Sequence, residues 1–139
     1  MDKNVKFEYK DGDAICTIQY KNQTFIGKAV CHPDDLDFES ERTGLFIAET
    51  RAIIKGLQFQ RECEIKPALN VLYHLYGNMA TSKNFNPKSY EAKMIRSQIK
   101  VLENDLAAIN ADLANERKNL KEYIDKKDIL YKKLRAKNQ

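Results

Sequence analysis

The sequence lacks the residue patterns that usually carry catalysis or bind metals. Its three cysteines, Cys16, Cys31 and Cys63, form no C-x-x-C pair, and no histidine stands at a zinc-binding spacing. There is also no glycine-rich phosphate loop, no H-E-x-x-H and no nucleophile elbow. We therefore predict that the protein is not an enzyme and has no catalytic residues, no bound metal and no other cofactor.

Long apolar runs and export signals are missing as well. The sequence shows no signal-peptide pattern and no run of 18 apolar residues. The number of cysteines is odd, which does not suit a disulfide framework. The net charge of +4 is a mild basic bias and does not by itself indicate nucleic-acid binding. These features predict a cytoplasmic protein that makes no contact with a membrane.

Glycine is absent between Pro87 and Lys137, where a heptad pattern predicts one long helix. The predicted oligomer seam consists of Ile95, Ile99, Leu102, Leu106, Ile109, Leu113 and Leu120, and the register continues through Glu116, Tyr123, Lys127, Leu130 and Leu134. A helix of about 50 residues is roughly 75 Å long and extends beyond the core that so small a chain can build. We expect the seam to bury against a second copy, another protein or the chain's own domain, and we favour a homo-oligomer, dimeric or higher.

The N-terminal part of the chain predicts a small sheet followed by helices. Apolar and polar residues alternate from Val5 to Tyr9, and further strands are predicted from Ala14 to Tyr20 and from Thr24 to Cys31. Gly56 predicts either a helix end or a close contact, and Gly77-Asn78 predicts the end of a later helix. The predicted fold is α+β: a three-stranded antiparallel meander packed by helices, then a long C-terminal coiled-coil-like helix. The predicted domains are residues 1–80, a loop over 81–87 and the heptad helix over 88–137.

The loop before the long helix combines three kinds of group that bind nucleotides. Phe85 and Tyr90 offer flat rings for stacking on a base, Asn86 offers an amide, and Arg96 offers a guanidinium for phosphate. These residues are the main predicted ligand-binding site. The alternative is that the two aromatic rings only fasten the long helix to the rest of the protein.

Arg51 and Lys28 are two further candidate ligand-binding residues. Arg51 lies beside an apolar helical stripe, where it could hold a phosphate, pair with an acidic residue or simply extend toward solvent. Lys28 shares one face of the third strand with Ile26 and Val30. A lysine there could contact a ligand, although a charge that keeps an edge strand from aggregating explains it equally well.

Two short motifs carry a resemblance to a known family. Residues 27–35 read G-x-A-x-C-x-P-x-D, and residues 44–52 read G-x-x-I-A-x-x-R-A. Over residues 24–57 the chain resembles the first Thoeris anti-defence family of Gram-positive phages and prophages. That resemblance implies a dimer or larger oligomer in an infected or lysogenic bacterial host. It also implies that the protein binds and sequesters a cyclic ADP-ribose-type immune signal without cleaving it.

Two other functions remain open at this stage. The chain could be a protein–protein inhibitor or an assembly factor that acts through its coiled coil. It could also be a nucleic-acid-binding module, because a three-stranded sheet followed by a helix resembles double-stranded RNA-binding domains, and basic residues gather near the C-terminus. The low net charge and the acidic residues at the start of the first helix argue against nucleic acid.

Overall fold

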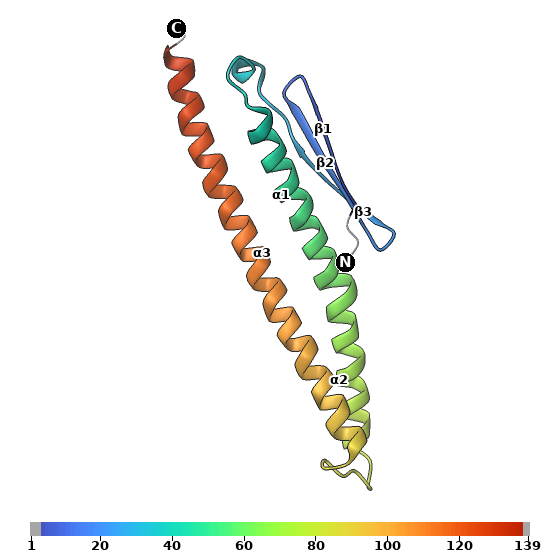
Figure 1. Cartoon of the computed structure of the whole chain (residues 1–139). Coiled ribbons are helices and arrows are strands. Elements are labelled where there is room, and N and C mark those ends of the chain that lie inside the picture. Colours follow the sequence, from blue (N-terminus) through green and yellow to red (C-terminus); the bar gives the residue numbers. More distant parts are fainter. Residues whose placement is uncertain (1–3, 138–139) are drawn as a thin grey trace. The chain divides into compact units, whose positions relative to one another are not determined.

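In the computed structural model, which describes residues 4–137, the N-terminal part of the chain forms a three-stranded antiparallel sheet (Figure 1). The strands are β1 (Asn4–Lys10), β2 (Asp13–Tyr20) and β3 (Gln23–Ala29), in the order β1-β2-β3. Asp11-Gly12 and Lys21-Asn22 form two-residue turns with the positive φ angles that tight hairpins need. The predicted meander is confirmed, except that Val30 and Cys31, expected in the third strand, follow the end of β3.

The helical segment after the sheet is continuous from residue 41 to 80. A short 3-10 turn, η1 (Pro33–Asp35), precedes α1 (Glu41–Phe59), the π-helical segment η2 (Gln60–Ile65) and α2 (Lys66–Ala80). Gly56 lies inside α1 and faces the ring of Phe25, so it marks a close contact and not a helix end. The expected end at Gly77-Asn78 is wrong, because α2 continues to Ala80.

α3 (Tyr90–Lys137) is the long C-terminal helix that the heptad pattern predicts. From Ile95 to Lys127 the expected seam positions are buried or half-buried, and most residues between them are exposed. The register then shifts, because Tyr131 is buried whereas Leu130, expected on the seam, is 53% exposed. The seam therefore continues from Lys127 to Tyr131, four residues on, and not to Leu130, three residues on.

Spatial packing divides the chain into two compact units. Unit 1 consists of Met1–Gly56 with Leu113–Gln139, and unit 2 consists of Leu57–Asp112. The domains predicted from sequence were consecutive segments that kept the long helix separate. In the structure, α1 and α3 each contribute residues to both units. Among residues 4–137 no helix is both long and apolar enough to cross a membrane.

The core of unit 1 lies between the sheet and α1, and α3 packs against it. Its buried residues are Ala14, Cys16, Ile18, Ala29, Ile47, Ala48 and Ala52, with Leu120, Tyr123 and Ile124 of α3 packed against them. In this unit the seam of α3 is therefore covered by the chain's own domain, which is one of the three partners expected for it. Small residues predominate where α1 meets the sheet, so the helix approaches the strands closely.

The closest approach of α1 to the sheet occurs at Gly27 of β3. A Cβ atom at this position would stand 1.9 Å from the carbonyl oxygen of Ala48 and 2.5 Å from the backbone nitrogen of Ala52. Only glycine leaves room for the helix backbone here. This contact places α1 over β3 and β2, and it decides which parts of the sheet are covered.

Candidate interaction surfaces

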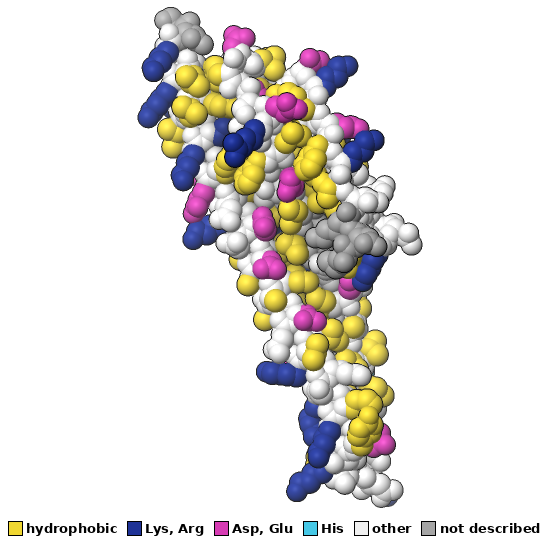
Figure 2. Space-filling model, in the orientation of Figure 1, with side chains coloured by type: hydrophobic (Ala, Val, Ile, Leu, Met, Phe, Trp, Pro, Cys, Tyr) yellow, Lys and Arg dark blue, Asp and Glu magenta, His cyan; other side chains and the backbone are white. Residues whose placement is uncertain are grey.

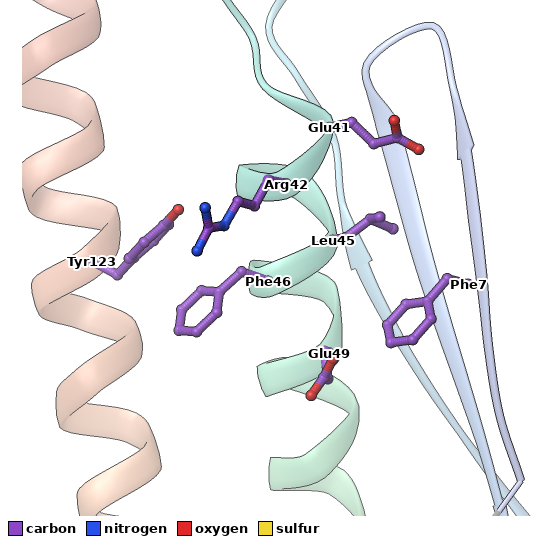
Figure 3. A pocket seen from close by; sticks show the side chains of 7 residues that line it. All are labelled: Phe7, Glu41, Arg42, Leu45, Phe46, Glu49 and Tyr123. Atoms are coloured by element: carbon purple, nitrogen blue, oxygen red, sulfur yellow. The ribbon is translucent and has the colours of Figure 1, made fainter.

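A wide groove crosses the exposed side of α1 in unit 1. Its volume is about 940 Å³, and its lining residues are Phe7, Glu41, Arg42, Leu45, Phe46, Glu49 and Tyr123. Figure 3 shows Phe7 of β1 beside Leu45 on one side of α1, and Phe46 beside Tyr123 of α3 on the other. The rings of Phe46 and Tyr123 lie 4.4 Å apart. Hydrophobic side chains also gather along α1 on the surface seen in Figure 2. The groove therefore offers aromatic and aliphatic walls to a partner.

The charges in this groove do not suit an anionic ligand. Glu41 and Glu49 contribute two carboxylates, and Arg42 contributes one guanidinium, so the lining carries more negative than positive charge. A phosphate group would be repelled by both carboxylates. The groove is better matched to apolar or cationic side chains of a protein.

The two outer edges of the sheet differ sharply. At the β3 edge, Arg51 of α1 donates from Nη1 to the carbonyl oxygen of Lys28 at 2.6 Å. One turn later, Lys55 donates from Nζ to the carbonyl oxygen of Ile26, also at 2.6 Å. Two cationic side chains thus occupy carbonyl groups that would otherwise be available to another strand.

The β1 edge carries no such cover among the described residues. Val5 is paired with Ile18 of β2 and Phe7 with Cys16. Because Ile18 and Cys16 belong to the core, the side chains of Val5 and Phe7 point to the core face of the sheet. Even so, Val5 is 46% and Phe7 45% exposed, because α1 does not cover this part of β1. Unit 1 therefore presents an open strand edge with uncovered core-facing residues next to the groove.

In unit 2, η2 with α2 and the first half of α3 form an antiparallel helical hairpin, and polar bonds close one side of it. The phenol of Tyr73 donates to Glu103 at 2.8 Å, and Arg61 donates to the side-chain oxygen of Asn110 at 3.2 Å. Arg96 donates to the hydroxyl of Tyr76 at 2.9 Å. The three α3 residues of this row follow seam positions directly and are seven residues apart, so they lie on one side of the helix.

The opposite side of the hairpin is apolar and open. On α3 the exposed residues there, Met94 (40%) and Val101 (55%), directly precede seam positions. On α2, Val71 (64%) and Leu75 (48%) directly precede the half-buried Leu72 and Tyr76, which form the seam of that helix. In an antiparallel helix pair, positions preceding the seam share one side, and those following it share the other.

A shallow groove of about 410 Å³ on the open side is lined by Gln60, Glu64, Ile65, Leu102, Asp105, Ala108 and Ile109. Only Leu69 and Ala92 are buried apolar residues of unit 2, so this hairpin has little core of its own.

The predicted nucleotide-binding loop is largely occupied with its own structure. Phe85 packs edge-on against Tyr76, with ring centroids 5.9 Å apart. Arg96 also donates to the carbonyl oxygen of Pro87 at 2.7 Å, and Asn86 accepts a bond from the backbone N–H of Lys88. For Phe85, these contacts agree with the alternative that the aromatic rings fasten the long helix to the rest of the protein.

Tyr90 differs from the other predicted ligand-binding residues of this loop. It is 72% exposed at the first position of α3, and its ring is open to solvent. A single exposed ring does not make a pocket, and no groove described above includes it.

Arg51 and Lys28, the other two predicted ligand-binding residues, are brought together by the structure. Their contact joins the Arg51 side chain to the backbone of Lys28 and not to its amine. Lys28 lies on the solvent face of β3, between the exposed residues Ile26 and Val30. Both residues therefore belong to the edge of the sheet. The sequence gave no signal for this arrangement, because it depends on tertiary packing.

Polar contacts that the sequence did not suggest hold the end of α3 within unit 1. Arg135 pairs with the buried Asp35 at 2.6 Å, and the phenol of Tyr131 donates to Glu39 at 2.8 Å. Burial, together with the hydrogen bond to Glu39, raises the pKa of the Tyr131 phenol. Burial, followed by the effect of Glu39, also raises the pKa of the Cys31 thiol to about 11. A thiol that stays protonated is a poor nucleophile.

Comparison with known proteins gives no family assignment. No protein-family model, curated protein or solved structure matches this chain. The resemblance to the first Thoeris anti-defence family therefore stays a prediction. Among the described residues, no group of three histidine, cysteine or acidic side chains is placed to hold a metal ion.

Proposed function

We propose that this protein is an interaction factor, an inhibitor or assembly factor, that binds an amphipathic helix of its partner on the open side of the unit 2 hairpin. The observation that carries the proposal is the difference between the two sides of this hairpin. Polar bonds cross one side at seven-residue intervals, while the other exposes a row of apolar side chains. Docking of a third helix is the usual way to cover such a row.

The charges beside the open side define the chemistry of the partner. Asp105 lies beside the apolar floor formed by Ile65, Leu102 and Ile109. The stretch of α2 from Pro67 to Ala80 contains no Asp, Glu, Lys or Arg. The apolar stripe of a partner helix would cover this uncharged stretch of α2. Lysine or arginine beside that stripe would face the acidic border of the groove.

A synthetic helix tests this proposal directly. The probe is a fluorescent amphipathic peptide of leucine and lysine, and its control replaces every lysine with glutamate. We expect the lysine peptide to bind, as measured by anisotropy, and the glutamate peptide not to bind. Val101→Lys should weaken binding at least about tenfold, because it removes an apolar contact and adds a repelling charge. Ala107→Lys adds the same charge at an exposed position that follows the seam residue Leu106, on the polar side of the hairpin, and should leave binding unchanged. Equal binding of both peptides, or equal effects of both substitutions, would overturn the proposal.

The predicted sequestration of a cyclic ADP-ribose-type signal has less support. Arg51 and Arg96 both donate to backbone carbonyl groups, and the unit 1 groove carries two carboxylates. It stays a prediction, which mass spectrometry of small molecules released from the purified protein can test. Release of an intact cyclic nucleotide would support it.

A further inference from the structure

The open edge of β1 has a sequence that complements itself. We propose that β1 pairs antiparallel with β1 of a second copy, centred on Phe7, and that two three-stranded sheets thereby become one six-stranded sheet. This inference concerns unit 1 and does not depend on the function proposed for unit 2. It rests on three observations: the alternation of charge along the strand, the uncovered core-facing residues and the blocked edge on the other side of the sheet.

The charges of β1 are arranged symmetrically about Phe7. Lys6 and Glu8 flank it on the solvent face, where they are within 3.9 Å of each other and their side chains are 77% and 60% exposed. When two antiparallel strands are centred on Phe7, Lys6 of each copy stands opposite Glu8 of the other. Both cross-strand pairs are then attractive, whereas a parallel, in-register arrangement would oppose like charges. The charges therefore select one register and one direction.

The apolar residues of β1 follow the same symmetry. On the core face, Phe7 would meet the second copy's Phe7, and Val5 would meet the second copy's Tyr9. Val5 and Phe7 are nearly half exposed although they point to the side of the sheet that α1 covers elsewhere. Pairing would bury them against their counterparts, which supplies an apolar contribution in addition to the hydrogen bonds of the ladder.

The blocked β3 edge explains why such an assembly would stop at two copies. Each copy has one open edge, because Arg51 and Lys55 occupy carbonyl groups on the other. A contact between identical surfaces related by a twofold axis is closed, so no further copy can add to the sheet. The geometry thus favours a dimer over a fibre.

Dimerisation would also change the groove of unit 1. Phe7 belongs both to the proposed interface and to the lining of the groove. Since α1 covers the same face of the sheet in both copies, the second copy's Phe7 would extend the apolar wall beside Leu45. Each groove would then contain a residue from the other copy, and a partner bound there would meet both.

Charge substitutions on β1 test the pairing. Lys6→Glu gives a strand with two acidic residues, and Glu8→Lys gives one with two lysines. We expect the wild-type protein to sediment as a dimer and each single variant to dissociate at least about tenfold more readily, since both cross-strand pairs become repulsive. An equimolar mixture of the two variants should restore dimers, because the two acidic residues of one copy then stand opposite the two lysines of the other. The double variant Lys6→Glu/Glu8→Lys should also dimerise. Both positions are exposed, so folding should be unaffected, which circular dichroism checks.

Three results would overturn the proposal. The first is a wild-type protein that sediments as a monomer at all concentrations measured. The second is a dimer that neither single variant weakens, which would place the contact away from β1. The third is a mixture of the two single variants that remains monomeric. None of these results affects binding of the leucine–lysine peptide, so the two proposals fail separately.

Discussion

The two edges of the sheet belong to the same small domain and yet have opposite characters. The β3 edge is covered by two cationic side chains from α1, and its backbone carbonyl groups are occupied. The β1 edge has no cover among the described residues and exposes side chains of its core face. The comparison shows that the placement of one helix decides which edge can accept another strand.

The placement of α1 depends in turn on a single glycine. Because Gly27 lets the helix backbone lie against β3, residues 51 and 55, one turn apart, reach past the strand to its outer edge. The same placement leaves Val5 and Phe7 of β1 uncovered. Blocking one edge and opening the other are therefore two consequences of one packing contact.

The largest effect on this comparison should come from Gly27→Val. The added side chain would overlap the backbone at Ala48 and Ala52, so α1 must move away from β3. We expect a loss of about 3 kcal/mol in the free energy of unfolding, measured by urea denaturation, together with loss of the β3 cover.

Gly77→Ala is the matched control for that substitution. A Cβ at Gly77 would have no neighbouring atom within 4 Å, and alanine favours the helix. Its stability should stay the same or rise by about 0.5 kcal/mol. If Gly27→Val were as stable as the wild type, the close approach of α1 would not be what holds the helix over β3.

A second, smaller effect should follow when the β3 edge is uncovered. Arg51→Met with Lys55→Met keeps the aliphatic stems but removes both bonds, at a cost of about 2 kcal/mol. Each copy would then have two open edges, so light scattering should detect assemblies larger than dimers. Lys93→Met with Lys100→Met removes the same charge from exposed positions of α3 and should not have this effect. Unchanged scattering of the edge variant would show that these two side chains do not block association.

The smallest effect should be on the rates at which the three thiols react with a maleimide. These rates report whether the sheet stays intact when its β3 edge is uncovered. We expect a maleimide to modify exposed Cys63 first. Cys31 should react more slowly, because burial and Glu39 raise its pKa to about 11 and keep the thiolate scarce at neutral pH. Cys16, buried in β2, should react last in the wild type and equally slowly in the edge variant. Fast reaction of Cys16 would mean that the sheet itself had opened.

Local signals in the sequence were enough to predict the strands and the long helix. Alternation from Val5 to Tyr9, turn residues such as Asp11-Gly12 and the heptad spacing after Ile95 each act over a few neighbouring residues. The continuity of the helices from residue 41 to 80 was missed, because Gly56 and Gly77 are permitted inside helices when packing favours them. The shift of register at Tyr131 was missed for a similar reason, since its contacts with Phe38 and Glu39 lie far away in the sequence.

The candidate site was harder to predict than the fold. Arg51 and Arg96 were predicted to bind a ligand, but sequence could not show that backbone carbonyl oxygens accept hydrogen bonds from both side chains. A guanidinium that holds a phosphate and one that caps a strand look alike in sequence. The symmetry of Lys6, Phe7 and Glu8, in contrast, is visible in the sequence, but it acquires meaning only once β1 is known to be an edge strand.

Amide hydrogen exchange at β1 tests the central claim most directly. Lys10 and Asp13 close the two-residue turn, so alternation in an antiparallel ladder directs the N–H groups of Val5, Phe7 and Tyr9 away from β2, toward the open edge. We predict that the N–H of Phe7 exchanges slowly in the wild-type protein and becomes faster in Glu8→Lys, while the N–H groups of β2 remain equally protected in both. Equally fast exchange at Phe7 in the two proteins would contradict the pairing of β1 with a second copy.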